Sequence, residues 1–134
     1  MTVRVRTMPQ IYDAVVPGSH EIEGFGAGGF RFADMSHRGS ILVLPSGISA
    51  WDVTTPTQIT PQSLQPVLDE PRGTIELLLI GTGEFLLPIR QDVRAALKEA
   101  GIGVDPMATA HAIATYNILV TEKRRVAAAL LAVS

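Results

Sequence analysis

Cysteine is absent from the 134 residues of the chain, and charged side chains are scarce. Without cysteine, disulfide bonds, thiolate nucleophiles, iron–sulfur clusters and cysteine zinc sites are excluded. Charged residues make up 18% of the chain, against about 25% in an average soluble domain. Thirteen acidic and eleven basic side chains give a net charge of −2. This balance argues against a general nucleic-acid binder, because such proteins carry a basic excess.

Long apolar runs are also missing. No segment approaches the roughly 18 consecutive apolar residues of a membrane span, and the longest runs are residues 77–80, 85–87 and 126–133. Two arginines stand among the first nine residues, but no apolar segment follows them, so the start does not resemble a secretory signal. We therefore expect a soluble, cytoplasmic protein without a transmembrane segment.

The length of the chain fits one domain. Residues 1–19, which include Pro9 and Pro17, predict a poorly ordered N-terminal arm. Regular patterns begin at His20, and no repeat or linker interrupts the chain after it. Residues 20–134 are therefore expected to form a single α/β domain.

Alternating polar and apolar residues predict a β-hairpin at the start of this domain. Residues 20–25 and 30–32 alternate, and the glycines among residues 26–29 supply the turn. Residues 37–40 indicate a second turn.

Two strands and a short helix are expected next. Residues 41–44 form a continuous apolar run, typical of a strand that is covered on both faces. Residues 48–53 predict the following strand. A helix then begins at Thr60, which can cap it, with Pro61 in the first helical position. Pro66 lies so near this start that the helix must be short or distorted.

The middle of the chain predicts a strand, a helix and a second strand. Residues 75–80 are the strongest strand signal, and residues 88–100 carry apolar side chains at helical spacing. A short strand at residues 102–104 follows, with residues 105–106 as its exit. This order predicts a parallel strand pair with a right-handed crossover.

The last segment leaves two alternatives open. Thr109 is a plausible N-cap, and apolar residues recur after it at helical spacing. Good helix formers continue through residues 126–131, so propensity favours one helix to the end of the chain. The alternative is a turn at residues 123–125 followed by a strand.

The Gly81-Thr82-Gly83 segment invites comparison with dinucleotide-binding loops, since it follows a buried strand. The third glycine of that motif would fall at Leu86, and only 29 residues follow Asp105. A tight turn that needs glycine is the better interpretation. We expect no cofactor, and neither NAD nor a nucleoside triphosphate should bind with a dissociation constant below ~1 mM.

No catalytic or metal site emerges from the remaining polar residues. His20, His37 and His111 have no carboxylate or second histidine three or four positions away, whereas a metal usually needs three or four convergent ligands. No serine lies in a nucleophile elbow. We expect no metal, and His111 is kept only as a candidate because it lies in the first turn of the last helix.

Tyr116 and Asn117 stand out within that helix. An asparagine inside an apolar helix is costly unless its amide is hydrogen-bonded. The pair therefore indicates either a buried polar lock that holds the helix to a loop or the wall of a pocket, and both stay open.

Any binding surface is expected beyond the carboxyl end of the strand at residues 75–80, where loops diverge in open α/β sheets. The alternative is that the same cluster is only a polar latch between helix and loop. The candidate residues are Gly81, Thr82, Gly83, Asp105, Thr109, His111, Tyr116 and Asn117.

Several motifs in this order and spacing resemble one small single-domain family. It includes a mitochondrial complex I (NADH:ubiquinone oxidoreductase) assembly factor, the human adipogenesis-associated domain-containing protein, and many uncharacterised bacterial and archaeal proteins. The resemblance covers residues 20–132. The motifs are Gly39-Ser40-Ile41-Leu42-Val43, Pro45-x-Gly47-x-x-x-Trp51, Leu79-Ile80-Gly81-Thr82-Gly83, Met107-x-Thr109, Thr115-Tyr116-Asn117-Ile118-Leu119 and Glu122-x-x-Arg125-Val126-x-Ala128-Ala129-Leu130.

The resemblance implies a three-layer α/β fold with a central mixed sheet, flanking helices and an additional β layer. It also implies that residues 126–131 form a strand. Family members commonly have a glycine and an arginine where this chain has Ala110 and Ala114, so a pocket there would be more apolar and less able to hold an anion. No catalytic residue is implied.

The leading hypothesis is a non-enzymatic binding or assembly module with a protein partner, similar to a respiratory complex I assembly factor. Peripheral contact with a membrane and the oligomeric state stay open. The alternative is a small-molecule-binding protein or weak enzyme that uses the loop after the strand at residues 75–80. A deep pocket of convergent polar groups would favour the alternative, and a shallow apolar patch would favour the module.

Overall fold

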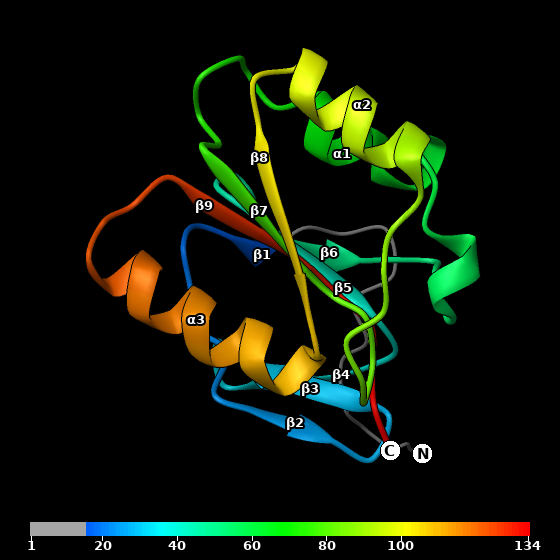
Figure 1. Cartoon of the computed structure of the whole chain (residues 1–134). Coiled ribbons are helices and arrows are strands. Elements are labelled where there is room, and N and C mark those ends of the chain that lie inside the picture. The colour runs from blue at the N-terminus through cyan, green and yellow to red at the C-terminus, as the bar shows by residue number, and fades with distance from the viewer. Residues whose placement is uncertain (1–15) are drawn as a thin grey trace.

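The computed structural model describes residues 16–134, which fold into three layers (Figure 1). A six-stranded sheet forms the middle layer. Two helices, α1 (Gln65–Leu68) and α2 (Gln91–Glu99), cover one face. Helix α3 (Thr109–Thr121) and a three-stranded sheet cover the other. The α/β class and the additional β layer are therefore as expected.

The central sheet is mixed. Its order is β1-β6-β5-β9-β7-β8, and the pairs among β1, β6, β5 and β9 are antiparallel. Strand β7 runs parallel to both β9 and β8. The strands are β1 (Val16–Pro17), β5 (Ile41–Leu44), β6 (Gly47–Ala50), β7 (Leu77–Gly81), β8 (Gly103–Met107) and β9 (Val126–Leu130).

The expected poorly ordered arm falls mainly on residues 1–15, which lie outside the described residues. Val16 and Pro17, the next two residues, pair with Ile48 and Gly47 of β6.

The two continuous apolar runs form inner strands, as predicted. Every residue of β5 is buried, and β7 is buried from Leu78 onwards. Strand β7 starts at Leu77, two residues later than expected, and Glu76 just before it is exposed. Side chains from both faces of these strands enter two apolar clusters, one under α1 and α2 and one under α3.

Strand β8 is longer than the sequence indicated. Asp105 and Pro106, expected as its exit, pair with Leu79 and Ile80 of β7. Proline is tolerated here because β8 is the edge strand of the sheet. No strand lies beyond β8, so the N–H that proline lacks is not needed for a hydrogen bond on that side. Helix α2 connects β7 to β8 as predicted, although it begins three residues later than position 88.

The predicted hairpin is present in the small sheet, which consists of β2 (Gly24–Gly26), β3 (Gly29–Phe32) and β4 (Met35–Arg38). Residues 20–23 precede it outside any strand. The expected turn at residues 37–40 was partly wrong, because His37 and Arg38 belong to β4. Its second half, Gly39 and Ser40, does separate β4 from β5. A further turn, Ala33–Asp34, connects β3 to β4, and its two non-glycine residues have φ 50 and 60°.

The segment after β6 is short and irregular. The strand ends at Ala50 rather than at residue 53, and Trp51 turns into the core, where its Nε1 donates to the Ser63 carbonyl at 2.8 Å. Two short 3₁₀ turns, η1 (Pro56–Gln58) and η2 (Gln62–Leu64), lead into α1. Helix α1 has only four residues, as Pro66 in its first turn implies.

The end of the chain is helix α3 followed by strand β9, as the family resemblance implied. Helix propensity alone was wrong here. Lys123, at φ 62°, reverses the chain after α3. The alanines at 127–129 then lie fully buried between β5 and β7. Sheet pairing at the centre of the fold outweighs the modest helix preference of alanine.

Candidate functional site

The carboxyl end of β7 lies against the first turn of α3. A Cβ atom on Gly81 would stand 2.9 Å from Thr109 Oγ1 and 3.0 Å from Thr109 Cα, so only glycine permits this approach. Gly83 has φ +106°, which also favours glycine. The glycine pair thus serves a tight turn, in agreement with the interpretation from sequence.

The Thr109 hydroxyl joins three segments at this point. Its side chain is fully buried, and its Oγ1 accepts a hydrogen bond from Gly83 N at 3.0 Å. The same hydroxyl donates to the Leu131 carbonyl at 2.9 Å. Thr109 N donates to the Gly83 carbonyl at 2.8 Å. The strand end, the helix start and the segment after β9 are therefore tied together, and no hydroxyl proton is left for a ligand.

Thr82 holds the next loop. It is 2% exposed, and its backbone N donates to the Met107 carbonyl at 2.8 Å. Its Oγ1 lies 2.6 Å from the Phe85 carbonyl and 3.1 Å from the Met107 carbonyl, and it donates to one of them. It accepts from Leu87 N at 3.0 Å. The backbone of residues 85–87 is thereby fixed from inside.

The same loop turns its side chains outward. Phe85 is 73% exposed, Leu86 62% and Leu87 42%. We call residues 85–87 the apolar loop. It is the longest run of exposed large apolar side chains among residues 16–134.

A shallow hollow of about 230 Å³ lies beside this loop. Phe25, 46% exposed, lines it from the small sheet. The other lining residues are Gly83, Glu84, Ala110, Val133 and Ser134. Apart from Glu84, no lining residue carries an ionisable side chain, so the hollow offers shape and apolar contact more than polar recognition.

Asp105 and His111 stand apart from the hydrogen-bonded junction. Asp105 is exposed on the edge strand β8, and His111 is exposed on α3. Neither makes a side-chain hydrogen bond or an ion pair with another residue in the range 16–134. Neither residue lines the hollow beside the apolar loop.

Asn117 locks α3 to the start of the small sheet. Its Oδ1 accepts from Ile22 N at 2.9 Å, and its Nδ2 donates to the Ile22 carbonyl at 2.8 Å. Tyr116 is 2% exposed and packs in the cluster under α3. Burial, with the nearby negative charge of Glu21, raises the pKa of Tyr116 to about 12. The geometry is that of a polar lock.

The structure therefore brings Gly81, Thr82, Gly83 and Thr109 together. It places Tyr116 and Asn117 against the segment before β2.

The apolar loop was visible in the sequence as a short apolar run but was not assigned a role. The signal that could have identified it is a Phe-Leu-Leu run between a glycine turn and Pro88, outside any strand or helix pattern.

His37 is buried, which its sequence context did not indicate. It is 4% exposed, and its Nδ1 has no hydrogen-bond partner in the described part of the chain. Burial lowers the pKa of His37, while a hydrogen bond with the Ser40 backbone acts in the opposite direction. The side chain is neutral near pH 7 and belongs to the inner face of the small sheet.

Within residues 16–134, no group of three or more histidine, aspartate or glutamate side chains could hold a metal ion. No helix in that range is both long and apolar enough to cross a membrane.

Comparisons with known proteins match nearly the whole domain. A family model described as "Protein of unknown function (DUF498/DUF598)" matches residues 22–131. An uncharacterized protein of Rhodobacter capsulatus is 34% identical over 85% of this chain and 86% of its own length. NADH dehydrogenase [ubiquinone] 1 alpha subcomplex assembly factor 3 of Danio rerio is 37% identical over 82% of this chain, which spans 63% of that protein.

A solved structure shows the same fold. The crystal structure of a Bartonella henselae protein, described as an outer membrane protein, is 49% identical to this chain with a TM-score of 0.84. The match covers 88% of this chain and 98% of the other.

Proposed function

This chain belongs to the family of unknown function DUF498/DUF598, and from that premise we propose that it is a non-enzymatic binding module that assists the assembly of a respiratory complex. The names of its animal relatives, which are assembly factors for NADH dehydrogenase, support this role. The chain spans only about three fifths of their length, so the role proposed here is that of the shared domain. A cytoplasmic location with peripheral contact to the respiratory membrane is part of the proposal.

The observation that carries the proposal is the apolar loop. Three adjacent large apolar side chains face solvent, and burying one such side chain stabilises a complex by roughly 1.5–3 kcal/mol. A loop that is already fixed loses little conformational freedom on binding. The bonds from Thr82 to the backbone of Phe85 and Leu87 supply this preorganisation.

The rest of the candidate surface supports the loop. Gly81, Gly83 and Thr109 form the junction from which the loop departs. We include the exposed Asp105 and His111 as polar rim groups of the proposed surface, because protein interfaces commonly have a polar rim around an apolar centre. Tyr116 and Asn117 contribute indirectly, because they fix α3 against the small sheet that carries Phe25.

A small-molecule site at the same place is less well supported. The hollow of about 230 Å³ is smaller than the ~300–1,000 Å³ of typical ligand pockets. The hydroxyls of Thr82 and Thr109 are occupied by internal hydrogen bonds. A shallow apolar patch was the feature expected of a binding module.

The test is genetic complementation. The gene is deleted in its native organism, and assembled NADH dehydrogenase is followed by native gel electrophoresis and by the NADH oxidation rate of membranes. The chain is returned as wild type, as the double variant Phe85→Ser/Leu86→Ser, or as Ile118→Ser. Ile118 is a matched control because it is 60% exposed but lies on α3.

We expect deletion to lower the amount of assembled complex. Wild type and Ile118→Ser should restore it, and the double variant should not, although it folds. Normal assembly after deletion would refute the assembly role. Full rescue by the double variant would refute the role of the apolar loop and leave the assembly role standing.

A further inference from the structure

The outward face of the small sheet has an unusual composition. Strand register places six residues on it in two rows across β2, β3 and β4. The rows are Gly24–Arg31–Ser36 and Gly26–Gly29–Arg38. The alternate residues, among them Phe30, Phe32 and His37, are buried on the inner side. Every outward position is therefore glycine, serine or arginine, without an apolar side chain or a carboxylate.

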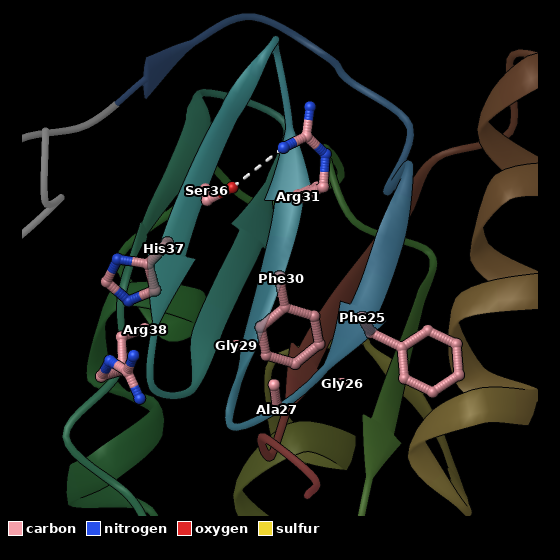
Figure 2. A pocket seen from close by; sticks show the side chains of 9 residues that line it. All are labelled: Phe25, Gly26, Ala27, Gly29, Phe30, Arg31, Ser36, His37 and Arg38. Carbon is pink, nitrogen blue, oxygen red and sulfur yellow. Dashed lines mark hydrogen bonds between the residues drawn. The ribbon is translucent and has the colours of Figure 1, made fainter. Parts of the chain in front are cut away.

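The glycines leave a hollow between the two arginines. Its volume is about 320 Å³, and Gly26 and Gly29 line it together with Arg31, Ser36 and Arg38. Figure 2 shows Arg31 and Ser36 at one end of β3 and β4, Arg38 at the other end of β4, and the two glycines opposite it. In an antiparallel pair, such diagonal neighbours lie roughly 7–8 Å apart at their Cα atoms. Figure 2 draws their guanidinium groups pointing away from each other, so both exposed side chains must turn over the glycine floor to bind one ligand.

Both arginines are exposed and lack an ion-pair partner within residues 16–134. The carboxylates nearest in sequence, Glu23 and Asp34, do not pair with them. One hydrogen bond orients the site: Arg31 Nη1 donates to Ser36 Oγ at 3.1 Å. Two arginines without an ion-pair partner among the described residues thus line one hollow in a chain whose net charge is −2.

We propose that this hollow binds a phosphate monoester, with the phosphate between Arg31 and Arg38. The arginine fork matches phosphate oxygens in geometry as well as charge. A monoester carries about −1.5 to −2 charges at pH 7, which two arginines balance, whereas a diester carries only one. The remainder of the ligand lies over the glycine floor toward Phe25, which also lines the hollow.

This site is separate from the proposed function. It shares only the lining residue Phe25 with the hollow beside the apolar loop, and none of its charged residues lies there. Either proposal can therefore fail without the other.

The test is a titration of the isotopically labelled full chain, followed by two-dimensional NMR at constant ionic strength. Phenyl phosphate is the soluble monoester probe, and diphenyl phosphate is the diester comparison. Vesicles of phosphatidylcholine with and without phosphatidic acid present the same monoester on a lipid. The variants are Arg31→Gln, Arg38→Gln and Ser36→Ala, with Arg94→Gln, exposed on α2, as the matched control.

Saturable shifts confined to β2, β3 and β4 are expected with phenyl phosphate, and weaker binding with the diester. Arg31→Gln and Arg38→Gln should each weaken binding about tenfold or more, since a hydrogen bond to a charged group is lost. Ser36→Ala should have a smaller effect, and Arg94→Gln none. All melting temperatures should stay within a few degrees of wild type.

Binding only to phosphatidic acid vesicles, lost in the same two variants, would support the site with a lipid as the source of the monoester. Two results would overturn the proposal. One is the absence of saturable binding both to phenyl phosphate and to the phosphatidic acid vesicles. The other is equal weakening by Arg94→Gln, which would show only general attraction of anions to a charged surface.

Discussion

Thr109→Val tests whether the junction at the end of β7 holds the fold together. Valine nearly matches threonine in shape, so the change removes the hydroxyl while the packing stays almost intact. Gly83 N would lose its acceptor at 3.0 Å, and the Leu131 carbonyl would lose its donor at 2.9 Å. Thr109 and Leu131 are buried and Gly83 is half-buried, so water cannot replace the hydroxyl at the Leu131 carbonyl and can reach only the Gly83 N–H.

The expected loss follows from these two groups. A buried polar group left without its partner costs about 1–3 kcal/mol. Two neighbouring groups that relax together should cost about 2–4 kcal/mol, since such losses are not additive. Thr109→Ser keeps the hydroxyl and loses one methyl group, so it should cost about 1 kcal/mol.

Urea denaturation, followed by circular dichroism, measures the free energy of unfolding of both variants. The values are compared with wild type provided that the slope of this free energy against urea concentration is unchanged. The reasoning is refuted if Thr109→Val loses less than about 1 kcal/mol, or if Thr109→Ser is the more damaging change. Either result would mean that the hydrogen bonds of the Thr109 hydroxyl do not stabilise the junction.

Three further outcomes are expected. Leu78→Ala in β7 should cost roughly 2–5 kcal/mol in a denaturant melt because Leu78 is fully buried, and a loss below about 1 kcal/mol would contradict its central position. Asn117→Ala should destabilise the fold by about 1–3 kcal/mol because the Ile22 N–H and carbonyl lose their partners. Asn117→Ser should be about as destabilising, because the single serine hydroxyl cannot replace both hydrogen bonds of the amide. Burial lowers the pKa of His37 below 6.5. Below about pH 6.5, the His37 side chain is therefore protonated more readily in the unfolded chain than in the folded one. Stability should therefore hold above about pH 6.5 and fall below it by at most about 1.4 kcal/mol per pH unit. His37→Gln should have a flatter profile between pH 7.5 and 5.5, and identical profiles would contradict the burial of a neutral imidazole.

Local patterns predicted the parts of the fold that local physics determines. The apolar run of β5 and the turn at Ala27–Gly28 are short-range signals, and both were found. Asn117 was identified as costly in an apolar helix, and its amide is indeed bonded on both sides to Ile22. The cost of an unbonded buried amide is a general fact, so the need for a partner could be inferred without knowing which residue supplies it.

The remaining parts depend on contacts between distant segments. Strand β9 is made of residues that prefer helices, and it forms because β5 and β7 offer unpaired edges on both sides. His37 and Arg38, the second half of strand β4, were predicted to lie in a turn because the register of β4 with β3 is set by Ala33 and Asp34, two residues with no strong turn signature together.

The same reason explains what the sequence could not show about the sites. A Phe-Leu-Leu run usually indicates burial, and only the hydroxyl of Thr82, bonded to the backbone of Phe85 and Leu87, fixes this run at the surface. The outward alignment of Arg31 with Arg38 depends on the pairing of β3 with β4. The candidate surface was placed at the end of β7 by the general rule that ligands bind beyond the carboxyl ends of parallel strands, and this position stays a prediction.

The central claim is that the apolar loop contacts a protein of the respiratory complex during its assembly. Photo-crosslinking in the native organism tests it directly, with a benzophenone amino acid in place of Leu86 or, as the control, of Ile118. We expect a crosslink from position 86 to an NADH dehydrogenase subunit or an assembly intermediate, and none of comparable strength from position 118. Equal crosslinking from the two positions, or no crosslink from position 86 to that complex, would contradict it.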